Sequence, residues 1–249
     1  MSQGQWFEEP MSQGHWFLGH WVPWKYARIL PMSRPDSYLT ILKAGEGEIE
    51  EKASRFLGLA APVKSEAEAE EILTSVRKAH YKARHHCYAF ILGEDGARRR
   101  SSDDGEPSGT AGLPILNVID GSGCTDTLIV VTRYFGGTLL GTGGLVRAYT
   151  RAAQEALNAT EIVEMCACVQ MQVTIPYTDH DRVQYALQQA ERNEEGKRRL
   201  RTSEPVYTDT VTLSVTVREN EAAFLQTLLT QETSGRAVFQ LSTPEFLAL

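Results

Sequence analysis

The chain has 249 residues, of which 42% are hydrophobic, and its formal net charge is −7. This length supports one large or two ordinary globular domains, and the acidic balance excludes a basic nucleic-acid-binding surface that extends over the whole chain. The sequence contains no run of 18 apolar residues and no signal peptide at its start, so we expect no membrane span and a cytoplasmic location.

Residues 1–31 differ from the rest of the chain. The segment MSQGQWF at 1–7 is nearly repeated as MSQGHWF at 11–17, and all four tryptophans lie in this leader. Two copies of seven residues are too few for a repeat fold. We expect a low-order leader with two open interpretations. In the interpretation that we favour, the translation start is wrongly assigned and Met32 is the natural first residue. In the other, the leader is an accessory tail that binds a partner.

Two strands are predicted at 38–44 and 48–60, joined through glycines. A helix is predicted after them, because Ser65 and Glu68 have the spacing of a capping box and apolar residues then recur on one helical face.

His85 and His86 open the next predicted strand, which ends at Leu92. Neighbouring side chains on a strand point to opposite faces, so His85, His86 and Cys87 cannot all bind one metal ion without distorting the strand. We favour a structural histidine that is hydrogen-bonded to a neighbouring loop over a ligand or a catalytic base. Both histidines remain possible site residues.

An acidic loop lies at 102–112, with the sequence SDDGEPSGTAG. It contains Asp103, Asp104, Glu106 and Ser108 and leads into an apolar stretch that predicts a helix. Carboxylates in such a loop either hold Mg²⁺ or cap the helix and complement its dipole, and we favour capping. The preceding run of three arginines at 98–100 is interpreted as a solvated counter-charge.

A glycine-rich passage, RYFGGTLLGTGGLVRAY at 133–149, joins a buried strand at 128–131 to a helix predicted from Gly143 to about Asn158. Such glycines serve either an anion that approaches the backbone N–H groups or a tight turn with close helix–sheet packing. Arg147 favours the anion, because a cation near a helix start opposes the macrodipole. Neither a dinucleotide fingerprint nor a P-loop fits the spacing, since Val146 replaces the last glycine of the former and the latter lacks its lysine.

These observations lead to one site hypothesis. Backbone N–H groups and Arg147 hold a phosphate-like or carboxylate group, Arg133 assists, and the acidic loop forms an opposite wall. The proposed anion-binding residues are Arg133, Gly136, Gly137, Gly141, Thr142, Gly143, Gly144 and Arg147, and the wall residues are Asp103, Asp104, Glu106 and Ser108.

The last third of the chain shows the order strand, helix, strand, strand, helix, strand. The elements are expected at 167–176, from Asp179, at 197–204, at 206–218, from an Asn220 cap to Gly235, and at 236–242. This order predicts a ferredoxin-like domain at 166–249, after a linker without periodicity at 160–165. The first domain is expected at 32–160.

Three segments together resemble the IMPACT/YigZ family of translation-associated proteins. They are ARHHC at 83–87, SDDGEPSGTAG at 102–112, and RYFGG at 133–137 with GTGGLVRAY at 141–149. The resemblance covers about residues 37–249 and implies an α+β protein of two domains. The first would be an α/β sandwich like domain 2 of a small-subunit ribosomal protein and the GHMP kinases. The second would resemble the C-terminal ferredoxin-like domains of elongation factor G.

The resemblance also implies a role in translation without naming a reaction. We therefore favour a cytoplasmic binding protein that contacts RNA, the ribosome or a translation factor through the glycine and arginine loop and the second domain. The alternatives are an enzyme that binds a phosphate ligand and uses the Asp103–Glu106 loop, and a protein-binding adaptor. We expect no cofactor and no bound metal, since the four cysteines lack metal-knuckle spacing and read as reduced thiols.

Overall fold

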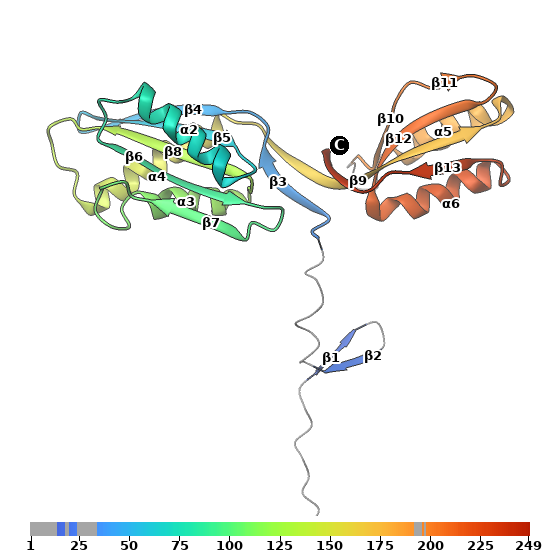
Figure 1. Ribbon diagram of the computed structural model, residues 1–249, viewed down its shortest axis with the longest axis horizontal. Coiled ribbons are helices and arrows are strands. Elements are labelled where there is room, and N and C mark those ends of the chain that lie inside the picture. Colours follow the sequence, from blue (N-terminus) through green and yellow to red (C-terminus); the bar gives the residue numbers. More distant parts are fainter. Residues whose placement is uncertain (1–13, 18–19, 24–33, 192–195, 197) are drawn as a thin grey trace, which may run out of the picture. The chain divides into compact units, whose positions relative to one another are not determined.

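The computed structural model describes residues 14–17, 20–23, 34–191, 196 and 198–249 (Figure 1). In the leader, strand β1 (Gly14–Phe17) pairs antiparallel with β2 (His20–Pro23), so that Trp16 lies opposite Trp21. The remainder of the expected leader lies outside the described residues. Residues 1–34 and 35–249 form separate compact units.

The first domain contains a five-stranded antiparallel sheet (Figure 1). Its spatial order is β4 (Gly45–Glu51), β5 (Ser54–Pro62), β8 (Thr127–Tyr134), β6 (His85–Leu92) and β7 (Arg98–Ser102). The strand expected at 48–60 is in fact a hairpin that turns at Lys52 and Ala53, both with positive φ. The arginine run at 98–100 belongs to the edge strand β7, which the sequence did not indicate.

Helices cover both faces of this sheet. Helices α3 (Gly112–Ser122) and α4 (Thr142–Asn158) pack on one face and α2 (Glu66–Ala79) on the other. Alternation along β6 agrees with the prediction, because Cys87 and Ile91 lie in the core under α3 and α4, whereas Phe90 lies in the core under α2. A strand buried on both faces is apolar throughout.

The predicted capping of α2 is confirmed. The Ser65 hydroxyl accepts a hydrogen bond from the Glu68 N–H group at 3.2 Å, and the Glu68 carboxylate accepts one from the Lys64 N–H group at 2.8 Å. The first bond satisfies a donor that the first turn leaves without an intrahelical partner, and the second ties Lys64, the residue before the N-cap, to the helix start. No helix among the described residues is long and apolar enough to cross a lipid bilayer.

The second domain has the expected β-α-β-β-α-β order. It runs through β9 (Ile162–Ile175), α5 (His180–Ala190), β10 (Leu200–Thr202), β12 (Val211–Arg218), α6 (Ala222–Glu232) and β13 (Val238–Leu241). The strands lie in the order β13-β9-β12-β10, which is the ferredoxin-like arrangement, and alternate residues of β12 are buried under the helices. The strand expected at 206–218 is divided into β11 (Val206–Tyr207) and β12, which pair with each other, and the short strand β14 (Glu245–Ala248) was not expected.

Two details of the prediction are wrong. Most of the expected linker at 160–165 belongs to β9, which pairs there with β3 (Ser37–Ile41), so sheet pairing continues where periodicity was absent. Asn220 does not cap α6, because it lies within the 3₁₀ turn η2 (Glu219–Glu221) that precedes the helix. The domain boundaries themselves stay a prediction.

Candidate anion-binding site and its supporting network

The loop between β8 and α4 uses its first glycines for packing. A Cβ atom at Gly136 would lie 2.1 Å from the Ala53 backbone, and the Gly136 N–H group donates to the Ser54 hydroxyl at 3.1 Å. Gly137 has a φ of +88°, which favours glycine. Close packing against the β4–β5 turn explains Gly136 and the positive φ explains Gly137, so neither glycine requires a ligand.

The later glycines lie at the exposed start of α4. Gly141 is the N-cap residue with a φ of +70°, and no side chain caps the helix. Thr142 and Gly143 are exposed, and Gly144 is buried beside Leu140. The first intrahelical bond runs from the Leu145 N–H group to the Gly141 carbonyl at 3.0 Å. The N–H groups of 142–144 are therefore the orphan donors of this helix end.

Arg147 lies beside these donors. Its side chain is exposed, and a Cβ atom built on Gly143 would lie 3.6 Å from one of its guanidinium nitrogens. Within the part of the chain that the structure describes, Arg147 forms no ion pair. The guanidinium and the amide donors thus add their positive potential at one place on the surface.

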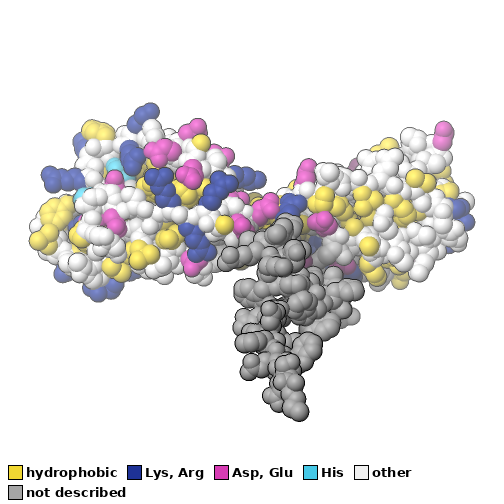
Figure 2. All heavy atoms as spheres, turned by 60° about the horizontal axis from the view of Figure 1, so that its bottom comes forward, with side chains coloured by type: hydrophobic (Ala, Val, Ile, Leu, Met, Phe, Trp, Pro, Cys, Tyr) yellow, Lys and Arg dark blue, Asp and Glu magenta, His cyan; other side chains and the backbone are white. Residues whose placement is uncertain are grey.

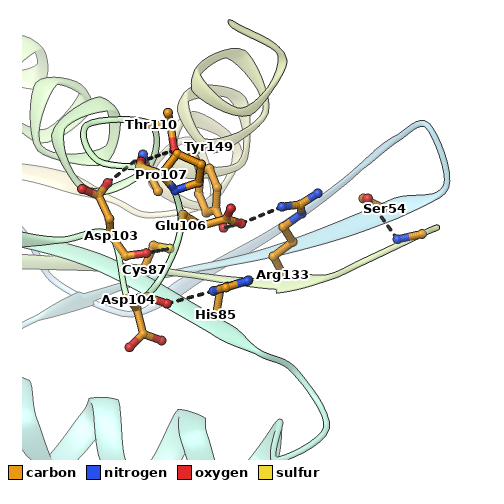
Figure 3. A network of polar contacts seen from close by, with 12 residues as sticks. Ser54, His85, Cys87, Asp103, Asp104, Glu106, Pro107, Thr110, Arg133 and Tyr149 are labelled. Carbon is orange, nitrogen blue, oxygen red and sulfur yellow. Dashed lines mark hydrogen bonds and ion pairs between the residues drawn. The ribbon is translucent and has the colours of Figure 1, made fainter. Parts of the chain in front are cut away.

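Arg133 does not join this surface. Its guanidinium donates to the Glu106 carboxylate at 2.7 Å, and the two side chains are only 7% and 4% exposed (Figure 3). The Tyr149 hydroxyl donates to the same carboxylate at 2.8 Å. Glu106 and Arg133 are therefore paired in the domain interior, and neither faces an anion at the start of α4.

The sequence did not predict the polar role of Tyr149. A buried Tyr hydroxyl usually has a hydrogen-bond partner. A tyrosine on a helix face otherwise made of Leu and Ala could therefore have predicted a buried hydrogen bond. Its ring packs edge-on against Phe56 at 5.2 Å between centroids. Burial, with the nearby Cys87 and Glu106, raises the pKa of Tyr149 far above its usual value, so the hydroxyl stays a donor.

Asp103 caps α3, as the favoured interpretation predicted. Its carboxylate accepts hydrogen bonds from the N–H groups of Gly109 at 2.8 Å, Ala111 at 3.0 Å and Gly112 at 2.8 Å. Burial acts to raise the pKa of Asp103, but the three donors outweigh it and lower that pKa below its usual value. Among the described residues no cluster of His, Cys, Asp and Glu side chains is suited to hold a metal ion.

Asp104 and the two histidines tie the acidic loop to β6. The His85 ring is bonded to the Asp104 carbonyl at 2.8 Å (Figure 3). The Asp104 carboxylate accepts a hydrogen bond from the His86 N–H group at 2.6 Å. The His86 ring contacts the Thr132 hydroxyl at 3.1 Å, and burial lowers the pKa of His86. The His85 ring is thus bonded to a neighbouring loop, as expected for a structural histidine, whereas the His86 ring bonds a residue of strand β8. A role of either histidine in a binding site stays a prediction. Ser108 is exposed at the loop surface.

Two runs of basic residues, at 98–100 and 197–201, contain several arginines that form ion pairs. Arg99 bonds Asp120 at 2.6 Å and Arg100 approaches Glu66 at 3.6 Å. In the second domain Arg198 pairs with Glu191 and Arg199 with Glu221, while Lys197 lies outside the described residues. Figure 2 shows Lys and Arg side chains intermixed with Asp and Glu on the first domain. Arg98 likewise forms no ion pair among the described residues, so Arg147 is distinguished by its position beside the N–H donors at the start of α4.

The fold and site define a class of protein. It joins an α/β domain, with a helix start exposed beside an arginine, to a ferredoxin-like domain. Residues 52–157 match the Impact N-terminal domain, and residues 173–236 match a domain of unknown function, DUF1949. The chain belongs to the IMPACT family.

Relatives support this assignment along most of the chain. IMPACT family member YvyE of Bacillus subtilis is 36% identical over 201 residues, which cover 81% of this chain and 89% of that protein. An IMPACT family member of Haemophilus influenzae is 34% identical over 206 residues, covering 82% and 96%. IMPACT family member YigZ of Escherichia coli is 47% identical over 109 residues, covering 43% and 53%. The crystal structure of a hypothetical protein matches with a TM-score of 0.54 and 31% identity, covering 85% and 98%.

Proposed function

We propose that this protein is a translation-associated binding protein that contacts RNA, alone or within the ribosome, through the start of α4. The N–H groups of 142–144 and the Arg147 guanidinium would hold one backbone phosphate. Membership of the IMPACT family supports a role in translation. The N–H donors and the guanidinium at the start of α4 support a phosphate group as the ligand. A cytoplasmic location is part of the same proposal.

The observation that carries the proposal is the state of the α4 start. It combines an N-cap glycine without a side-chain cap, an exposed Gly143 and an exposed, unpaired Arg147 among the described residues. Orphan N–H donors at a helix start favour an anion, and a guanidinium recognises phosphate by charge and geometry together. The carboxylates of Asp103 and Glu106 are occupied by internal donors, which favours binding over the phosphoryl-transfer alternative.

Helix α4 supplies a matched pair of arginines for the test. Arg147 has no ion-pair partner in the described part of the chain, whereas Arg151, one turn later, is 60% exposed and lies 3.8 Å from Glu51. We expect Arg147→Ala to weaken binding to ribosomes and to labelled single-stranded RNA by about tenfold, and to reduce the salt dependence by about one released counterion. Arg151→Ala should change binding much less, and both variants should unfold at the wild-type urea midpoint.

The measurement is sedimentation with ribosomes, together with RNA binding, in low and high salt. Equal effects of the two substitutions would indicate diffuse charge and would remove the site from the proposal. If nothing binds in low salt while inorganic phosphate or a nucleotide raises the melting temperature, the protein binds a small ligand instead.

A further inference from the structure

The second domain exposes an ordered pair of aromatic rings. Tyr177 lies in the 3₁₀ turn η1 (Tyr177–Asp179) and Tyr207 in β11, with ring centroids 6.2 Å apart and ring planes 20° from parallel. The two residues remain 51% and 56% exposed. His180 adds its ring edge-on to Tyr207, with centroids 5.7 Å apart. We name Tyr177, His180 and Tyr207 the aromatic shelf.

Polar contacts hold the shelf in place before any ligand arrives. The Tyr177 hydroxyl donates to the Thr208 carbonyl at 2.6 Å and so ties η1 to the loop after β11. The Tyr207 hydroxyl lies 3.4 Å from the His180 ring. The turn before α5 and the β11–β12 loop meet at the end of β9, where Ile175 pairs with Val211 (Figure 1). Rings ordered in this way lose little conformational entropy on binding.

The surroundings of the shelf favour a cation. Asp181 is fully exposed and lies 3.3 Å from the His180 ring, and Asp209 is exposed next to Thr208. The arginines nearby are engaged within the protein. Arg236 bonds both carboxylate oxygens of Asp179, and Arg182 donates to the Glu232 carbonyl.

We propose that the aromatic shelf binds an arginine side chain from an exposed segment of a partner protein. The faces of tyrosine rings attract a guanidinium through their quadrupole. The negative carboxylates of Asp181 and Asp209 attract the same positive group. A phosphate group would be repelled by both carboxylates and would find few free hydrogen-bond donors at the shelf. The shelf therefore differs in chemistry from the proposed anion site at α4, and the inference does not depend on that site.

The test uses the full chain and fluorescein-labelled hexaarginine, with hexacitrulline as an uncharged probe of the same shape. We expect saturable binding of hexaarginine, weakened about two- to fivefold by Tyr207→Leu, which is the size of one exposed cation–π contact. Asp181→Asn should weaken it too, and because this side chain is fully exposed the urea midpoint should stay nearly unchanged. The matched control is Tyr185→Leu, since Tyr185 is a 64% exposed tyrosine of α5 outside the shelf.

Four results would overturn the inference. They are equal binding of hexacitrulline, an unchanged dissociation constant in Tyr207→Leu, an equal loss in Tyr185→Leu, and stronger binding in Asp181→Asn. Labelled oligouridine serves as the competing ligand. If it binds more tightly than hexaarginine and responds to Tyr207→Leu, the shelf stacks nucleobases and not guanidinium groups.

Discussion

Arg133 and Glu106 form a buried ion pair of 2.7 Å that joins strand β8 to the acidic loop at 102–112. Arg133 comes from the end of β8 and Glu106 from the loop before α3. Tyr149 of α4 donates to the same carboxylate, so three separate elements meet at one side chain. The Arg133 Nε atom is buried and has no hydrogen-bond partner among the described residues, which leaves Glu106 as the main compensation of its charge.

Replacing Glu106 by Gln should therefore destabilise the protein strongly. Gln keeps an oxygen for Tyr149 but removes the charge that compensates Arg133, and breaking a buried pair from one side costs about 3 to 5 kcal/mol. Urea unfolding followed by circular dichroism measures this loss. All four tryptophans lie in the leader, so their fluorescence is not a suitable probe of the domain.

The exposed pair of Glu48 and Arg55 provides the control. Its atoms are also 2.7 Å apart, but both side chains are about half exposed. Because solvent screens such pairs, Glu48→Gln should leave the urea midpoint almost unchanged. Similar losses in the two variants would show that the burial of Glu106 adds nothing to its importance.

Asp103 should make the stability of the first domain depend on pH. Its pKa is lowered in the folded state, so its contribution is complete above the unfolded pKa of about 3.9 and is lost as the pH falls through the folded pKa. Asp103→Asn should reduce the free energy of unfolding by about 1 to 2 kcal/mol at neutral pH. This difference should shrink below pH 4 and vanish in stronger acid. A difference that stays constant with pH would contradict a role for the charge.

Two glycines at the start of α4 should respond in opposite ways to alanine. Gly141→Ala should destabilise the protein by about 1 to 3 kcal/mol, because its φ of +70° and ψ of 167° lie in a region that is essentially restricted to glycine. Gly143 has room for a Cβ atom, so Gly143→Ala should stabilise α4 by up to about 1 kcal/mol. The same methyl group narrows access to the backbone donors and should weaken RNA binding. Unchanged binding would indicate that the ligand does not touch this turn.

The four cysteines should resist alkylation in the native protein. All four are buried, and burial raises the pKa of Cys87 to about 12 and that of Cys168 to about 11. The thiolate is the reactive form, so iodoacetamide at pH 8 should modify these residues only through unfolding. Mass spectrometry with and without urea measures the rates. Fast native labelling at Cys87 would contradict its packing against the Asp103 carbonyl.

Much of the architecture could be predicted from the sequence, because it depends on local patterns. Period-two alternation located β6 and period-3.6 spacing located α2, while the order of elements after residue 166 predicted the ferredoxin-like domain. These patterns extend over a few residues each, so they can be recognised without knowing which distant segments pack against them. The β4–β5 hairpin escaped prediction because its turn uses Lys52 and Ala53 at positive φ, where sequence normally shows Gly or Asn.

Tertiary structure alone decided which residues of the candidate site are paired within the protein and which are exposed. Arg133 and Arg147 are the same residue type in one glycine-rich passage, and the sequence does not distinguish their roles. In the structure Arg133 is buried against Glu106, which is 27 residues away, whereas Arg147 is exposed. Likewise, Gly136 packs against the Ala53 backbone, whereas Gly143 faces open space apart from Arg147. The sequence by itself determined which residue types lie near the start of α4. Which of them bind internally and which remain available depends on contacts between distant segments, and no local periodicity records such contacts.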